Sequence, residues 1–199
     1  MERIFSKEHA TEWLAPYGLM ILAGAAFSIL LCPERHALSA VLGIIIMYFW
    51  VYFAHRVLHV LPSEGLLSHL NTHWNFHHQP LKLLDRRVEL AIELINDLCM
   101  SLTILAIQYF SPWRVPTSVV VFFAIWYASV HIVNYSIIGS PHHREHHAQI
   151  HKNFGPDVMD HFFGTNHSNV REDLVGMTVN IIFAFALTFL LKETFHWNE

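Results

Sequence analysis

Five long apolar runs divide the 199-residue chain, separated by two short turns and two longer polar segments. Each run holds 17 to 22 residues, and about 20 apolar residues suffice for a helix to cross the hydrocarbon core of a bilayer. The sequence therefore predicts an all-α integral membrane helical bundle rather than a soluble protein with buried core helices. We expect four core transmembrane helices and a possible fifth, in the order Trp13–Cys32, Leu38–Ala54, Leu94–Phe110, Thr117–Ile138 and Leu174–Leu191.

The last run begins with Gly176, Thr178 and Asn180, so it can either span the membrane or lie on its surface. Composition favours one membrane-embedded domain over residues 1–199, because hydrophobic residues make up 53% of the chain and charged residues only 14%. The net charge of −4 argues against nucleic-acid binding, which usually needs a basic face. Cys32 and Cys99 lie inside apolar runs, which argues against a disulfide framework or a cysteine zinc site.

The distribution of basic residues predicts which side of the bundle faces the cytoplasm. Two helical hairpins would place residues 1–12, 55–93 and 139–172 on one side, where nine Lys and Arg residues accumulate. The opposite loops carry only Arg35 and Arg114, and Lys192 is assigned to neither side. Since Lys and Arg favour cytoplasmic loops, we expect the basic side to be cytoplasmic, in the endoplasmic reticulum of a eukaryote or the inner membrane of a bacterium.

Histidines, 17 in all against 12 Lys and Arg, concentrate in segments that this topology brings to the same side. Histidines four residues apart on a helix lie about 5–6 Å apart at Cβ, close enough to share a metal ion. Three groups have spacings of this kind, in the patterns HX3H, HX3HH and HX2HH. The eight candidate metal ligands are His55, His59, His73, His77, His78, His143, His146 and His147.

Eight imidazoles are more than one transition-metal ion binds, so they indicate two ions. Zinc, copper, iron and nickel all accept neutral imidazole, and the ligand type does not choose among them. A membrane metal transporter is an alternative interpretation. A transport path, however, places its ligands near the middle of the spans, whereas these histidines stand at helix ends and in the loops that follow.

The three groups resemble the histidine boxes of the membrane di-iron oxygenases. The third region is the most specific, and His131-x-x-Asn134 before it also resembles a family motif. Over about residues 40–166 the chain is similar to the fatty acid hydroxylase/sterol desaturase superfamily. The motifs that carry this similarity are Pro141-x-His143-Arg144-x-His146-His147, Asn153-Phe154-Gly155 and Asp160-His161-Phe162-Phe163-Gly164-Thr165.

Two positions depart from the family pattern. The second box of the family is usually HX2HH, whereas here His73 stands one residue further out and Trp74 occupies the expected place. The position of His161 is usually basic in the family, which favours a supporting role over metal ligation for this histidine.

The resemblance implies a non-haem di-iron oxidoreductase that uses O2 to attack a C–H bond of a membrane lipid. Electrons would come from a separate donor, such as cytochrome b5 or a ferredoxin with its reductase. The eight histidines would be the iron ligands, with no catalytic side chain beyond them. Candidates for additional ligands, or for groups that support the ligands, are His131, His142, Asn134, Asp160, His161 and His69.

Neighbouring side chains are expected to fix and shield the imidazoles. Groups that could hydrogen-bond to ligands and set their tautomers are Glu145, Asp160, Asn134, Asn153 and Asp97. Aromatic residues that could keep water from the site are Trp74, Phe76, Phe154, Phe162 and Phe163.

Several alternatives stay open at this point. Hydroxylation is favoured over desaturation as the reaction, although both begin with the same hydrogen abstraction. The substrate could be a sterol, a fatty acyl chain, an alkylglycerol, a sphingoid base or a carotenoid. The rival functions are a membrane metal transporter or metal-binding protein without redox activity, and an inactive scaffold.

Overall fold

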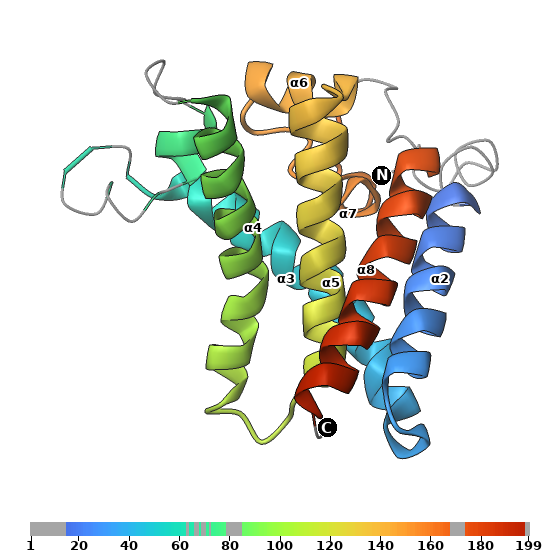
Figure 1. Ribbon diagram of the computed structural model, residues 1–199. Helices are drawn as coiled ribbons and strands as arrows, with labels where there is room; N and C mark the ends of the chain where they lie inside the picture. Colours follow the sequence, from blue (N-terminus) through green and yellow to red (C-terminus); the bar gives the residue numbers. More distant parts are fainter. Residues whose placement is uncertain are drawn as a thin grey trace.

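The computed structural model describes residues 15–62, 64–65, 68, 71, 73–78, 85–167 and 174–197. All regular structure in these residues is helical, as the sequence predicted. Five long helical segments run across the described part of the molecule, and most of the shorter helices gather at one end of it (Figure 1), whereas η2 lies at the turn between α2 and α3. The long segments are α2 (Ala15–Leu31), α3 (Ala37–Val60), α4 (Arg86–Gln108), α5 (Thr117–Ser129), continued by the π-helix η5 (Val130–Ile137), and α8 (Leu174–Phe195). The short helices are η2 (Glu34–His36), η4 (Trp74–His78), α6 (Pro141–Ala148) and α7 (Asp157–Phe163).

The long helices form the two predicted hairpins, α2 with α3 and α4 with α5 (Figure 1). Both hairpins turn at the same end of the bundle, so the C-terminal end of α3 and the N-terminal end of α4 meet at the other end with α6 and α7. We call this second end the cap. Helix α8 runs away from the cap, and Lys192 near its end donates a hydrogen bond to the carbonyl oxygen of Leu31. Lys192 therefore belongs to the end opposite the cap.

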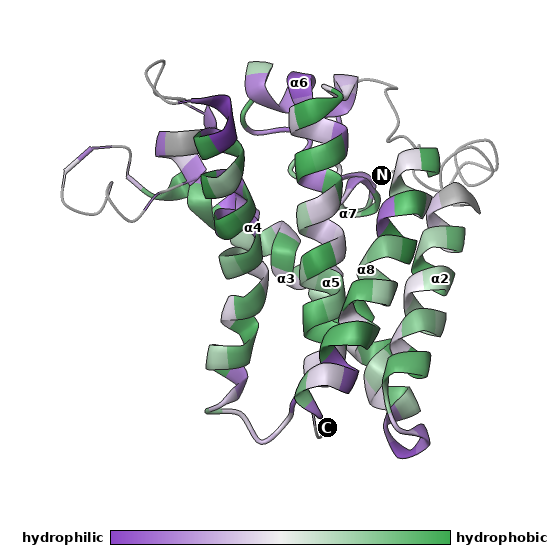
Figure 2. Ribbon diagram, in the orientation of Figure 1, coloured by the Kyte–Doolittle hydropathy of each residue, from purple (hydrophilic) through white to green (hydrophobic). Residues whose placement is uncertain are grey.

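Among the residues that the structure describes, four helices are long and apolar enough to cross a membrane. Hydrophobic residues predominate along the long helices, and hydrophilic residues gather at the cap and at the hairpin turns (Figure 2). The described part of α2 is also apolar, but it has only 17 residues, roughly 25 Å of helix, and is therefore shorter than these four spans. The candidate spans are Glu34–Val60, Arg86–Gln108, Thr117–Ile137 and Leu174–Phe195, so the chain is a multi-pass membrane protein in which the last apolar run is a full-length candidate span.

Polar side chains at the start of α8 do not prevent it from spanning, because they bond within the bundle. Thr178 Oγ1 donates to the carbonyl oxygen of Leu174 at 2.7 Å. Asn180 is buried, and its Nδ2 donates to Asn134 Oδ1 at 3.1 Å and to the carbonyl oxygen of Gly176 at 2.9 Å. In a bilayer such internal pairing is what makes a polar residue tolerable.

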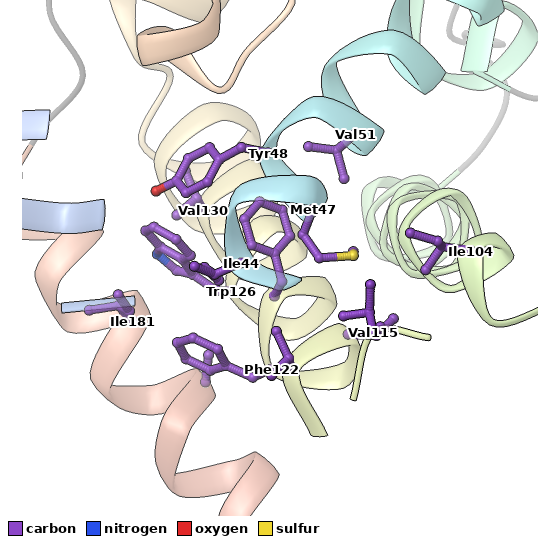
Figure 3. Packing of buried hydrophobic residues seen from close by; sticks show 14 of the residues in the cluster. Ile44, Met47, Tyr48, Val51, Ile104, Val115, Phe122, Trp126, Val130 and Ile181 are labelled. Carbon is purple, nitrogen blue, oxygen red and sulfur yellow. The ribbon is translucent and has the colours of Figure 1, made fainter. Parts of the chain in front are cut away.

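The core lies where α3 crosses α5, and its centre is aromatic (Figure 3). Tyr48 packs edge-on against Phe123 and Trp126, with ring centroids 5.1 and 5.9 Å apart. Gly43 allows the close approach of the two segments, because a Cβ atom there would lie 2.8 Å from Val115 Cγ1. The crossing fixes where the last two turns of α3 emerge at the cap.

We expect Gly43→Ala to lower the thermal midpoint of unfolding (Tm) in detergent. The added methyl group would overpack a stiff valine contact, and overpacking typically costs about 1–3 kcal/mol. Gly18→Ala is the matched control, because no atom lies within 4 Å of its Cβ position, and alanine in a helix gains up to about 1 kcal/mol over glycine. Equal Tm values for the two variants would contradict the close crossing of α3 and α5.

Candidate metal centre

All eight histidines singled out from the sequence converge at the cap. The end of α3 provides His55 and His59, and α6 provides three more histidines. The remaining three come from the turn that ends at His78. They separate into two neighbouring groups. Cluster A contains His55, His59, His73, His78 and His146, and cluster B is built on His77, His143 and His147.

In cluster A the Nε2 atoms face one another at short distances. His55 Nε2 lies 2.9 Å from that of His73 and 3.1 Å from that of His59, and the third side of this triangle measures 3.3 Å. His78 Nε2 lies 3.2 Å from His73 Nε2. His146 Nε2 is buried and has no hydrogen-bond partner among the described residues. Five imidazole nitrogens thus point into one small volume.

Hydrogen bonds alone cannot satisfy this arrangement. A ring nitrogen carries either one hydrogen or one lone pair, so three mutually close nitrogens cannot all be paired with one another. Two nitrogens bound to one ion at about 2.0–2.1 Å each lie roughly 3 Å apart, which matches the separations in the triangle. The donor set of cluster A therefore fits a metal ion.

Cluster B repeats this geometry on a smaller scale. His147 Nε2 lies 3.0 Å from His77 Nε2 and 2.9 Å from His143 Nε2. The two clusters are in contact, because the rings of His78 and His147 have centroids 4.6 Å apart. Two ions held in this way would be close neighbours.

The extra residue in the second box is absorbed by a π-helical turn. In α6, which follows the usual HX2HH pattern, the first and last histidines meet in cluster B and the middle one, His146, joins cluster A. In the second box His73 and His78 likewise meet, while His77 turns to the other cluster. Because η4 is a π-helix with i→i+5 periodicity, residues five apart share a face there. His73 thus keeps its place among the candidate ligands.

Hydrogen bonds on the outer side of three rings set their tautomers. His55 Nδ1 donates to the carbonyl oxygen of Phe154, and His146 Nδ1 donates to that of Lys152 at 2.6 Å. His77 Nδ1 lies 2.8 Å from Glu93 Oε1. Carbonyl and carboxylate oxygens only accept, so each Nδ1 carries the hydrogen and each Nε2 keeps its lone pair for the cluster.

Asp160 supports this arrangement from one step further out. Its carboxylate accepts hydrogen bonds from the backbone N–H groups of Phe154 and Gly155 and from the Thr165 hydroxyl. Burial raises the pKa of Asp160 to about 6, although these hydrogen bonds favour the ionised form. Asp160 does not touch an imidazole of either cluster, but it holds the loop whose Phe154 carbonyl orients His55.

Glu93 on α4 was not identified from the sequence. Besides His77, its carboxylate meets Ser136 Oγ at 2.6 Å and His131 Nε2 at 3.3 Å. His131 Nδ1 lies 3.2 Å from Asp97 Oδ1, so this buried imidazole stands between two carboxylates. His131 and Glu93 also lie close enough to His77 and His143 to contribute ligand atoms of their own. The sequence feature that could have identified Glu93 is its position one helical turn before Asp97, beside a largely apolar run.

The remaining supporting candidates lie away from the two clusters. His142 and His161 both face the Asp157 carboxylate, at 3.2 and 3.5 Å. Asn134 bonds to Asn180 on α8. Glu145 pairs with His167. Asn153 donates a hydrogen bond to the carbonyl oxygen of His142 and accepts one from the backbone N–H of His167. His69 lies outside the described residues.

Two aromatic residues line cluster A. Phe154 contacts the rings of His55, His59 and His146, with centroid distances of 5.4 to 5.8 Å. Trp74, which replaces the usual first histidine of the second box, stacks on His78 at 5.5 Å. Phe162 and Phe163 instead pack on the aromatic residues of α3, and the Phe76 side chain lies outside the described part.

Burial lowers the pKa values of imidazoles in the two clusters and keeps them neutral. The pKa of His147 is lowered to about 4, first by burial and then by the neighbouring imidazoles. The pKa values of His73, His143 and His146 are lowered for the same reasons. Neutral imidazole is the form that binds a metal ion.

Comparison with known proteins assigns the family. The model of the fatty acid hydroxylase family matches residues 40–165, which contain all three histidine groups. The chain belongs to the fatty acid hydroxylase family. No curated protein and no solved structure matched the chain in the same comparisons.

Membership makes the protein an oxidoreductase of the general lipid hydroxylase or desaturase type. The family is known to use iron, and the two histidine clusters of this family member could bind such ions. The converging Nε2 atoms and the unpaired, buried Nε2 of His146 fit that use.

We expect Glu93→Gln to weaken metal binding at cluster B about 10- to 100-fold, the usual effect of losing a carboxylate that orients a histidine ligand. The amide keeps the shape of the side chain but removes the charge opposite His77. Chelator competition with the purified protein measures the affinity. Glu89→Gln, one turn earlier on α4 and paired with Arg86 at 3.2 Å, should leave the affinity unchanged. Equal affinities of both variants and the parent protein would refute the role of Glu93.

The Tm of the metal-free protein should fall as the pH is lowered from about 7.5 to about 5. Unfolded histidines take up protons near pH 6.5, whereas buried cluster imidazoles such as His143 and His146 have lowered pKa values and stay neutral. Acid therefore stabilises the unfolded chain. His146→Gln should reduce the fall, and replacement of the exposed His151 by Gln should not. A Tm independent of pH would contradict the buried neutral state.

Proposed function

We propose that the protein is a di-iron, O2-dependent lipid hydroxylase or desaturase. The observation that carries this proposal is the convergence of imidazole lone pairs in two adjoining clusters. The five imidazoles of cluster A would hold one iron ion. The three imidazoles of cluster B, with Glu93 beside them, would hold the second. When bound, the two ions would supply the activation of O2 and the oxidation of the substrate C–H bond.

The residues of the chain have three tasks in this reaction. The Nδ1 hydrogen bonds of His55, His77 and His146 hold the ligand rings in place before any ion binds. Phe154 and Trp74 cover cluster A and keep water away from it. The position of the cap at the ends of apolar spans would give a lipid access from the bilayer.

We favour hydroxylation as the reaction. Desaturation is the second candidate, because it would begin with the same hydrogen abstraction. A separate electron donor, such as cytochrome b5 or a ferredoxin with its reductase, would dock at the cap. The basic count of the histidine-bearing side supports a cytoplasmic cap. Of the described Lys and Arg residues, five lie on the side of the cap, against three at the other end; the five are Arg56, Arg86, Arg87, Arg144 and Lys152, and the three are Arg35, Arg114 and Lys192.

The competing function is a metal transporter. A transporter must release its ion along a path through the membrane, with ligands spaced along the spans. Here the candidate ligands form two adjoining clusters at one end of the bundle, and backbone carbonyls lock several rings in one tautomer. This fixed arrangement favours resident ions over transported ones.

Iron content tests the proposal, and single substitutions address the two clusters separately. We expect about two iron ions per chain in the parent protein, and about one in each of His146→Ala and His147→Ala, since a paired site holds one ion per cluster. Elemental analysis of protein purified without added zinc gives the count, and Mössbauer spectroscopy shows whether the ions are coupled. His151→Ala, which removes an exposed histidine that belongs to neither cluster, should keep both ions.

Activity is then measured by lipid profiling of cells that express each form, under O2 labelled with oxygen-18. Label in a lipid of the parent cells, absent from cells with either single variant, is the expected result for hydroxylation. New double bonds without label would indicate desaturation. A parent protein that holds no iron, or one whose iron is unaffected by both substitutions, would overturn the proposal.

A further inference from the structure

A narrow cavity opens within the membrane-spanning part of the bundle, between α3, α5, η5 and α8. Aromatic side chains form most of its walls, Met177 of α8 closes one side, and Asp157 stands at the cap end. With about 30 Å³ of room, it accepts a small group rather than a whole lipid.

Two hydrogen-bonding groups in its walls have no partner among the described residues. The indole Nε1 of Trp126 is buried and unpaired, in a side chain that is 3% exposed. Tyr48, which is 5% exposed, lines the same cavity, and its hydroxyl makes no hydrogen bond among the described residues. The two rings touch edge to face, and the oxygen and the nitrogen lie on the same side of the core (Figure 3). A buried donor is normally paired, so the Nε1–H of Trp126, with the Tyr48 hydroxyl beside it, indicates an oxygen acceptor that occupies the cavity.

The charges around the cavity select a neutral acceptor. None of the described side chains that line it is cationic. Asp157 lines its cap end, where the carboxylate accepts a hydrogen bond from Tyr17 and faces His142. His142 and Tyr17 already pair with this carboxylate, so a second carboxylate, or a phosphate, would meet like charge in a buried setting with no further cation in the cavity wall. An alcohol, ether, ester or amide oxygen has no such conflict.

The cavity also adjoins cluster B. Tyr135 lines it and stacks on the ring of His143, with centroids 4.6 Å apart and planes 9° from parallel. Tyr48 precedes His55 by seven residues on α3, and Trp126 precedes His131 by five on the helix of α5. These separations correspond to roughly 8–11 Å of helix, so a lipid held here by its oxygen has its chain within reach of the metal centre.

We propose that Tyr48 and Trp126 bind a neutral oxygen of the lipid substrate, so that the enzyme acts on an oxygenated neutral lipid and not on a free fatty acid or a bare hydrocarbon. The role of this lipid as a substrate rests on the proposed function, whereas the binding site itself is inferred from the cavity and its two donors.

Binding of tritiated 1-octadecanol to the metal-loaded protein in nanodiscs tests the inference, with octadecane and stearate as competitors. We expect both competitors to displace the alcohol at least about tenfold less well than unlabelled 1-octadecanol. Tyr48→Phe and Trp126→Phe should each weaken binding of the alcohol roughly two- to tenfold, the usual effect of one lost hydrogen bond. Neither substitution should change the competition by octadecane.

Tyr52→Phe is the matched control, because Tyr52 lies one turn further along α3, is equally buried and bonds to Thr165 instead. Circular dichroism and gel filtration confirm that each variant is folded. Octadecane or stearate binding as tightly as the alcohol would overturn the inference, and so would an equal loss in Tyr52→Phe or no loss in both cavity variants. The assay needs neither O2 nor turnover, so its outcome is separate from that of the iron and activity measurements.

Discussion

The cap depends on hydrogen bonds that imidazoles make on the side facing away from the clusters. His55 and His146 each donate Nδ1–H to a backbone carbonyl, and His77 donates to Glu93. Each bond leaves the Nε2 lone pair directed inward, where an ion would otherwise have to compete with a proton. The carbonyls belong to the loop of residues 152–154, which the buried Asp160 carboxylate holds through two backbone N–H groups. One carboxylate that touches no cluster imidazole therefore supports the orientation of a candidate ligand.

Much of this architecture could be predicted from the sequence because two periodicities are simple. Runs of about 20 apolar residues can do little except span a bilayer or form a buried core, and histidines three or four residues apart on a helix must share a face. The eight histidines and the pairing of the hairpins follow from these two rules. Positions such as Asp160 follow in part, since its importance was expected but its contact with the backbone was not.

What could not be predicted depends on contacts between distant segments and on irregular helix. The spacing of His73 and His77 suggested one shared face of an α-helix, whereas the π-helical turn pairs His73 with His78 and sends His77 to cluster B. Sequence spacing does not reveal where a helix widens, because the widening is stabilised by what surrounds it. Glu93 was missed for a related reason. It belongs to a different segment from His77, and only the packing of α4 against η4 brings them to 2.8 Å.

The two clusters differ in the charge that surrounds them, and this difference bears on how they would hold ions. Cluster A presents five neutral imidazoles, and an ion bound there would keep its full charge in a largely buried setting. Cluster B lies beside Glu93, and Asp97 follows one turn later on the same helix, with His131 between the two carboxylates. Because charge buried without compensation is costly, an ion of higher charge is more stable beside the carboxylates of α4 than in the all-imidazole cluster. Helix α4 therefore forms part of the bilayer-spanning bundle and also makes the electrostatic surroundings of the two clusters different.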